Sequence, residues 1–197
     1  MIKTIVGSFD SFNDAHAVAN DLRAAGFLDS DMSIVANNAA GEFREDPRVT
    51  ESNEGSATAK GAVTGAVVGG GAGLAASLAG LAIPGIGPII AAGPIVATLA
   101  GAGTGAVAGG LIGGLVDLGV PESDAQYYAE SVRRGGALVT VRADESRADE
   151  VAAILRERGA VDIEGRVERW RESGWHGFDQ SAQPYTVDEI RRDRAMY

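Results

Sequence analysis

The longest feature of the hydrophobic pattern is a stretch without charged residues in the middle of the chain. No Asp, Glu, Lys or Arg lies between Lys60 and Asp117. Glycine recurs there at every fourth position in two arrays, and residues four apart share one face of an α-helix. Each array predicts a helix stripe without side chains, along which helix backbones pack closely. The predicted helix-packing residues, which are also the predicted oligomer contacts, are Gly61, Gly65, Gly69, Gly73, Gly101, Gly105, Gly109 and Gly113.

Proline and glycine interrupt this stretch between the two arrays. The predicted turn residues are Pro84, Gly85, Gly87 and Pro88, because proline and glycine end one helix before the next begins. The pattern predicts a helical hairpin with helices over 57–82 and 94–118. Glycine costs a helix about 1 kcal/mol relative to alanine, so these helices are expected to form only where close packing offsets that cost.

A β-α-β pattern precedes the uncharged stretch. Residues 3–9 alternate and include β-branched side chains, which predicts a strand. Ser11 and Asp14 have the spacing of a capping box, which predicts that a helix begins there. This helix is expected to end at Gly26, and 32–36 predict a second strand. The apolar face of the helix is predicted to consist of Ala15, Val18, Ala19 and Leu22.

A second unit of the same kind follows the uncharged stretch. After a short helix that opens at Pro121, with Ala125, Tyr128, Ala129 and Val132 on its apolar face, residues 137–141 predict a third strand. Ser146 and Asp149 predict another capping box, for a helix that buries Val151, Ile154 and Leu155 and ends at Gly159. Residues 161–164 alternate, which predicts a fourth strand. Two β-α-β units predict an α+β, ferredoxin-like (split βαβ) sandwich with an inserted glycine-zipper helical hairpin.

The remaining residues form an aromatic C-terminal extension. Trp170, Trp175, Phe178 and Tyr185 are expected to dock on the protein's own or a neighbouring surface, because dense aromatic side chains seldom stay exposed. A partner-binding arm is the alternative. Thr186 and Glu189 predict a capping box for a short helix over 187–196. The predicted organisation is a first sandwich half (1–36), a polar acidic linker (37–56), the hairpin (57–118), a helix with the second half (119–165) and the arm (166–197).

Composition restricts the classes of partner and chemistry. The net charge of −10 and the pI near 4.6 disfavour nucleic-acid binding through phosphate neutralisation. The absence of cysteine excludes disulfides, thiolate metal sites and cysteine nucleophiles. The first residues are too short and too strand-like for a signal peptide, which predicts a cytoplasmic protein.

The most enzyme-like motif is Gly71-Ala72-Gly73, which opens a match to the G-x-G-x-x-A dinucleotide fingerprint. That fingerprint requires an acidic residue about 20 residues further on, and none occurs before Asp117. The two histidines, His16 and His176, are far apart in the sequence and form no catalytic or metal-ligating set. We therefore expect no enzymatic activity, catalytic residue, metal or cofactor, and keep dinucleotide binding as a minor alternative.

Several motifs resemble one bacterial family. Ile5-Val6-Gly7-Ser8-Phe9-Asp10, the proline and glycine segment over 83–94, and the run from 121 to 141 are similar to general stress protein 17M-like and low-temperature-induced proteins with a glycine-zipper core. The resemblance extends over about residues 1–165 and is most specific over 121–141. It implies a stress-associated role and no enzymatic activity, cofactor or catalytic residue.

Two environments suit the predicted hairpin. Each helix is about as long as a bilayer requires, but the large aliphatic residues of the first contribute only about −2 to −4 kcal/mol of insertion free energy. A homo-oligomer buries the same surface between subunits. The sequence therefore predicts a self-associating stress protein whose hairpin mediates membrane association, oligomer assembly or both, in the cytoplasm or at the inner membrane. A soluble regulatory or ligand-binding ferredoxin-like module is the alternative.

Overall fold

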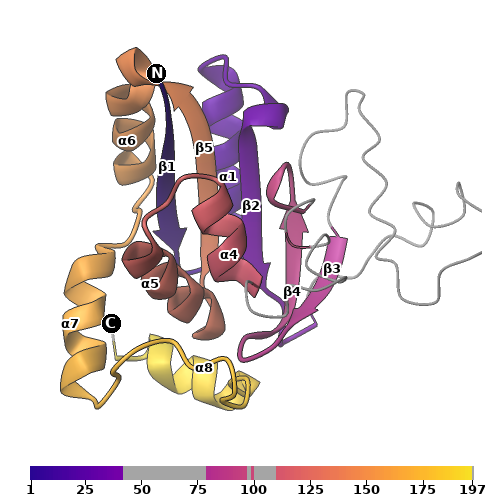
Figure 1. Ribbon diagram of the computed structural model, residues 1–197, viewed down its shortest axis with the longest axis vertical. Coiled ribbons are helices and arrows are strands. Elements are labelled where there is room, and N and C mark those ends of the chain that lie inside the picture. Colours follow the sequence, from indigo (N-terminus) through magenta and orange to yellow (C-terminus); the bar gives the residue numbers. More distant parts are fainter. Residues whose placement is uncertain (42–78, 97–98, 100–109, 197) are drawn as a thin grey trace, which may run out of the picture.

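The computed structural model describes residues 1–41, 79–96, 99 and 110–196, and this part of the chain has a mixed α/β fold (Figure 1). Its strands are β1 (Ile2–Phe9), β2 (Met32–Asn37), β3 (Ala79–Ile83), β4 (Gly87–Ala92) and β5 (Ala137–Asp144). Its α-helices are α1 (Phe12–Ala24), α4 (Gly110–Asp117), α5 (Glu122–Arg133), α6 (Ala148–Glu157), α7 (Ile163–Glu172) and α8 (Val187–Arg194). The strands form one five-stranded antiparallel sheet in the order β1-β5-β2-β4-β3.

The centre of the sheet joins the two ends of the chain. β5 lies between β1 and β2 and is antiparallel to both, with Val141 opposite Ile5 and Val139 opposite Ile34. The predicted first helix is confirmed: Ser11 caps α1 by accepting a hydrogen bond from the Asp14 amide, and the four predicted apolar residues are the buried ones. The strands predicted over 3–9, 32–36 and 137–141 are confirmed as β1, β2 and β5.

Both faces of the sheet are covered by apolar side chains. On one face, α1 and α6 pack against residues such as Ile34 and Val139. On the other, α4 and α5 pack against Val35, Leu138 and three isoleucines of the β3–β4 hairpin, Ile83, Ile86 and Ile89. Neighbouring residues of a strand point to opposite faces, so β2 and β5 supply both clusters. The result is a sheet between two layers of helices (Figure 1).

The predicted inserted helical hairpin is wrong in its central part. Residues 79–83 form β3 instead of the end of a helix, and 87–92 form β4, so this segment extends the sheet. The physical reason is tertiary pairing. β4 pairs with β2, placing Ala91 opposite Val35, and its Ile89 and Ile90 enter different apolar clusters, as strand geometry requires. No helix among the described residues combines the length and the apolar character needed to cross a bilayer.

The predicted fourth strand is also wrong. Residues 163 and 164 begin α7, because the Asp162 side chain accepts a hydrogen bond from the Gly165 amide and caps a helix there. A backbone hydrogen bond joins this segment to the edge of the sheet, from the Val161 amide to the Ser8 carbonyl at 2.8 Å. The predicted capping box at Ser146 is wrong as well, since Ser146 lies in a 3-10 turn before α6 and caps no helix.

Candidate functional site

The glycine arrays lie largely outside the described residues. Of the predicted helix-packing positions, Gly61, Gly65, Gly69, Gly73, Gly101, Gly105 and Gly109 are outside them. Gly113 lies in α4, and a Cβ added there would meet no atom within 4 Å among the described residues. The close-packed stripe therefore stays a prediction.

Residues that flank the second array meet in one buried cluster. Leu99 precedes the array and Leu111 lies within its last interval, and both pack with Ile83, Ile89 and Leu115 on the α5 side of the sheet. β3 is likewise the first described element after the first array. The described segments next to both arrays therefore meet in the same buried cluster on the α5 side of the sheet.

The four predicted turn residues lie in a β-hairpin and not between helices. Pro84 and Gly85 are in the turn, and Gly87 and Pro88 begin β4. Gly85 has φ +78° and Gly87 has φ +96°, backbone conformations that favour glycine. The sequence therefore identified a chain reversal but assigned the wrong elements to its two sides.

The C-terminal arm lies against α5 and the residues that follow it. Trp170 in α7 is buried, and its ring meets that of Trp175 edge-on with centroids 5.8 Å apart. Phe178 packs against the apolar cluster on the α5 side of the sheet. The Tyr185 ring lies 4.7 Å from the guanidinium carbon of Arg133. All four predicted arm aromatics are thus at least partly covered by the protein itself.

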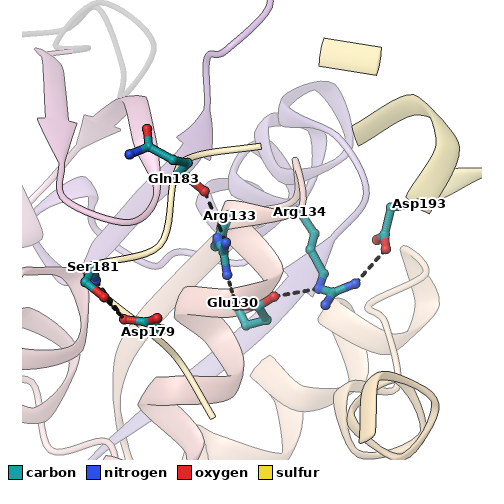
Figure 2. Close-up of polar contacts among 7 residues, drawn as sticks. All are labelled: Glu130, Arg133, Arg134, Asp179, Ser181, Gln183 and Asp193. Atoms are coloured by element: carbon teal, nitrogen blue, oxygen red, sulfur yellow. Dashed lines mark hydrogen bonds and ion pairs between the residues drawn. The ribbon is translucent and has the colours of Figure 1, made fainter. Parts of the chain in front are cut away.

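A buried carboxylate organises the polar contacts beneath this arm (Figure 2). Glu130 of α5 is 0 % exposed. It accepts a hydrogen bond from Arg134 Nε at 2.7 Å and a longer one from Arg133 Nη1 at 3.4 Å. Arg134 Nη1 in turn donates to Asp193 of α8 at 2.6 Å. A chain of charges therefore runs from the interior of α5 to the last helix, and we call Glu130, Arg134 and Asp193 the charge relay.

Two aromatic rings and two carboxylates surround the Arg134 guanidinium of the charge relay. The Arg134 guanidinium lies 4.8 Å from the centroid of the Trp170 ring and 5.4 Å from that of Tyr185. Desolvation by burial disfavours the charged form of Arg134, but the carboxylates of Glu130 and Asp193 outweigh it and raise the pKa of the Arg134 guanidinium. Desolvation also raises the pKa of the Tyr185 hydroxyl above 10.0. The tyrosine is therefore neutral at ordinary pH.

The arm also contacts the tip of the β3–β4 hairpin. A Cβ added to Gly85 would lie 2.9 Å from the carbonyl oxygen of Asp179 and 2.9 Å from the Cα of Gln180. A Cβ added to Gly87 would lie 2.9 Å from the Pro184 ring. Such distances leave no room for a side chain, so the backbone of the arm packs directly on the backbone of the turn.

A separate groove of about 370 Å³ lies beside the outer edge of β1. Val6 and Ser8 of β1, Leu155 and Arg156 of α6 and Tyr128 of α5 contribute to its lining. Burial raises the pKa of the Tyr128 hydroxyl above 10.0. The lining is mainly apolar, which suits retention of a small molecule better than acid–base chemistry.

No catalytic set emerges from the described residues. Gly71-Ala72-Gly73 lies outside them, and the His16 ring stacks on Phe12 with centroids 5.7 Å apart. The described part of the chain contains no group of three or more His, Cys, Asp and Glu residues placed to hold a metal ion. The chain matches no protein-family model, no curated protein and no solved structure.

Sequence reasoning missed the charge relay altogether. One signal for it was present: Glu130, Arg133 and Arg134 are spaced i, i+3 and i+4, so they share one helix face directly before a glycine pair. Such a pattern ordinarily marks a solvated ion pair. The third member of the relay, Asp193, lies 59 positions after Arg134 and is placed beside it only by the fold.

Proposed function

We propose that this protein is a non-enzymatic, self-associating general stress protein. In this proposal the glycine arrays pack helices of different copies together, and the α/β domain carries them. A lipid bilayer is the alternative environment for the same apolar surface. The resemblance to general stress protein 17M-like proteins supports the stress-related part of the proposal.

The observation that carries the proposal is where the described segments next to the arrays attach to the domain. β3, β4 and α4 contribute to the buried cluster on the α5 side of the sheet, so the described segments next to both arrays meet there. An array with no charged residue would expose a large apolar surface on an isolated monomer. Glycine at every fourth position favours burying that surface between closely packed helices.

For the fold we propose a truncated ferredoxin-like arrangement. The order β1-α1-β2, with β5 between the two parallel strands and α6 after β5, agrees with the split β-α-β pattern. α7 takes the place of a fourth strand, and the β3–β4 hairpin is added at the opposite edge. A ferredoxin-like assignment is in keeping with a binding or assembly role but does not identify one.

Substitution within the arrays tests the proposal. Gly69→Leu and Gly105→Leu place side chains on the predicted stripes, whereas Gly71→Leu lies off the register of the first array. Leucine improves both helix propensity and membrane insertion, so only loss of close packing predicts a smaller assembly. We expect light scattering to show dissociation of the Gly69 and Gly105 variants and not of the Gly71 variant. Unchanged mass in all three would contradict a contact stripe.

A soluble ligand-binding module is the second candidate, and the groove beside β1 is the observation that favours it. In that case a small apolar ligand should raise the melting temperature of the wild-type protein. Leu155→Trp, which fills the groove, should remove the effect while the assembly mass stays unchanged. Fractionation of native protein between membrane and soluble pools separates the bilayer alternative from both candidates.

A further inference from the structure

The C-terminal arm contacts both the tip of the β3–β4 hairpin and the end of α5. After α7 the chain crosses the tip of the β3–β4 hairpin at 179–184 and then forms α8 beside the end of α5 (Figures 1 and 2). The hairpin forms the outer end of the sheet and joins the remaining strands only through β2. Contact with the arm is therefore a further attachment for this hairpin, besides its pairing with β2 and the burial of three of its isoleucines on the α5 side of the sheet.

The attachment at α8 is built from specific contacts. Asp193 accepts the hydrogen bond from Arg134, and Ile190 is buried against Gly135. Arg194 donates to the Gly135 carbonyl. A capping box at Thr186 fixes the start of the helix. These contacts come from a helix of two turns, so α8 is held mainly by its docking and not by its own helix stability.

The crossing segment is held in register between its two ends. Arg133 donates from Nη2 to the Gln183 carbonyl at 3.1 Å (Figure 2). Its guanidinium stacks on the Tyr185 ring. Asp179 closes a local turn by accepting from the Ser181 amide at 2.8 Å. The hydrogen bonds from the Ser181 hydroxyl and amide hold the pKa of the Asp179 carboxylate below 3.8, and the smaller effect of desolvation opposes this shift. Release of α8 therefore removes one end of a segment that otherwise contacts Arg133 of α5 and the tip of the hairpin.

We propose that the C-terminal arm docks reversibly, that the docked arm holds the β3–β4 hairpin in place, and that the Asp193–Arg134 ion pair keeps the arm docked. We call the arm in this role the strap, and the Asp193–Arg134 pair its catch. Opening the strap frees the hairpin while the β1-β5-β2 centre of the sheet stays folded. The strap deepens the proposed function, since the hairpin adjoins the glycine arrays, but its opening is a property of the single chain.

The two tryptophans make the strap directly observable. Both Trp170 and Trp175 lie in the arm region, so the intrinsic tryptophan fluorescence of the full-length protein reports on its docking. Amide hydrogen exchange reports on the hairpin, for example at Ile86, whose amide donates to the Ile83 carbonyl at 3.1 Å. The two methods together show whether arm and hairpin open in one step.

Asp193→Asn removes the charge of the catch, and Asp188→Asn is its matched control. Asp188 lies in the same helix, but its ion pair with Arg191 is long, at 3.4 Å, and exposed. We expect Asp193→Asn to accelerate exchange of the arm and of 83–92 by about 10- to 100-fold, as loss of a desolvated charge contact predicts. The tryptophan fluorescence of Asp193→Asn should shift in parallel, while the exchange rates of β1 and β5 stay unchanged. In the Asp188→Asn variant, neither the exchange rates nor the fluorescence should change.

A second pair of variants tests the strap from the hairpin side. Gly85→Ala and Gly26→Ala both place alanine at a positive φ, of +78° and +87°, but only Gly85 has the arm backbone within contact. Coupling between two sites is reciprocal, so Gly85→Ala should also shift the tryptophan fluorescence and Gly26→Ala should not. Equal effects of the two glycine variants would overturn the proposal.

Two other outcomes also overturn it. If the fluorescence of Asp193→Asn shifts while exchange of 83–92 stays slow, the arm docks without holding the hairpin. If exchange rises in β1 and β5 as well, the arm is an inseparable part of the core. These readouts are independent of assembly mass, so failure of the strap is distinguishable from failure of the glycine arrays.

Discussion

Replacing Arg134 with methionine is the most informative single perturbation of the charge relay. Arg134 is the shared partner of two carboxylates, Glu130 at 2.7 Å and Asp193 at 2.6 Å. Methionine keeps much of the aliphatic stem but removes the guanidinium, together with its contact with the Trp170 ring, so the main change is the loss of the charge. The variant then contains a carboxylate at Glu130 that water does not reach, since its side chain is 0 % exposed.

The expected destabilisation of Arg134→Met follows from the burial of the Glu130 carboxylate. Removing one partner of a buried ion pair costs about 3–5 kcal/mol, because an uncompensated buried charge is left behind. Arg133 remains 3.4 Å from the other carboxylate oxygen of Glu130, so the lower end of this range applies. A loss of about 3 kcal/mol corresponds to a decrease of about 6–12 °C in melting temperature for a chain of this length.

The double variant Glu130→Leu/Arg134→Met isolates the cause. Leucine removes the enclosed carboxylate, and apolar replacement of a buried ion pair is often close to neutral. The double variant should therefore be more stable than Arg134→Met alone, by at least about 1.5 kcal/mol, a coupling typical of residues in one network. Urea unfolding followed by far-UV circular dichroism and by tryptophan fluorescence measures both free energies of unfolding.

Arg191→Met is the control, because the Asp188–Arg191 pair is largely exposed and its loss should change stability by no more than about 0.5 kcal/mol. The reasoning fails if Arg134→Met is as mild as this control. It also fails if Glu130→Leu and Arg134→Met act additively, since the two side chains would then not depend on each other.

Further variants test local features of the same structure. Thr186→Ala should destabilise α8 by about 0.5–2 kcal/mol in thermal unfolding, whereas Ser146→Ala should have almost no effect, because only the first residue caps a helix. Hydrogen bonds from Thr186 lower the pKa of Glu189. Its contribution to stability is therefore complete above the ordinary value of 4.5 and is lost as the pH falls through the lower folded value, a dependence that Glu189→Gln should abolish. Gly93→Ala should destabilise far more than Gly159→Ala in urea unfolding: their φ angles are +84° and +79°, but only at Gly93 does an added Cβ meet the backbone of β2. Equal losses at the two glycines would show that backbone conformation alone, and not the close approach to β2, requires glycine.

The elements whose signals are local follow from the amino-acid sequence alone. α1 follows from Ser11 and a regular apolar face, α8 from the capping box at Thr186, and β5 from a run of β-branched residues. The pattern in each case lies within about a dozen residues, and hydrogen bonds and side-chain packing close to the segment are enough to select its structure. The chain reversal at Pro84 and Gly85 was predicted for the same reason.

The elements on either side of that reversal depend on strand pairing between segments far apart in the sequence. Glycine, alanine and isoleucine in 79–92 are compatible with a helix in a close-packed hairpin and with a strand, and pairing with β2 selected the strand. Residues 161–164 alternate like a strand, but the cap at Asp162 and the burial of Val167 and Trp170 stabilise a helix there. The charge relay has the same origin. Glu130 and Arg134 share a helix face by sequence alone, whereas their burial, and the arrival of Asp193 beside Arg134, depend on where the C-terminal arm docks.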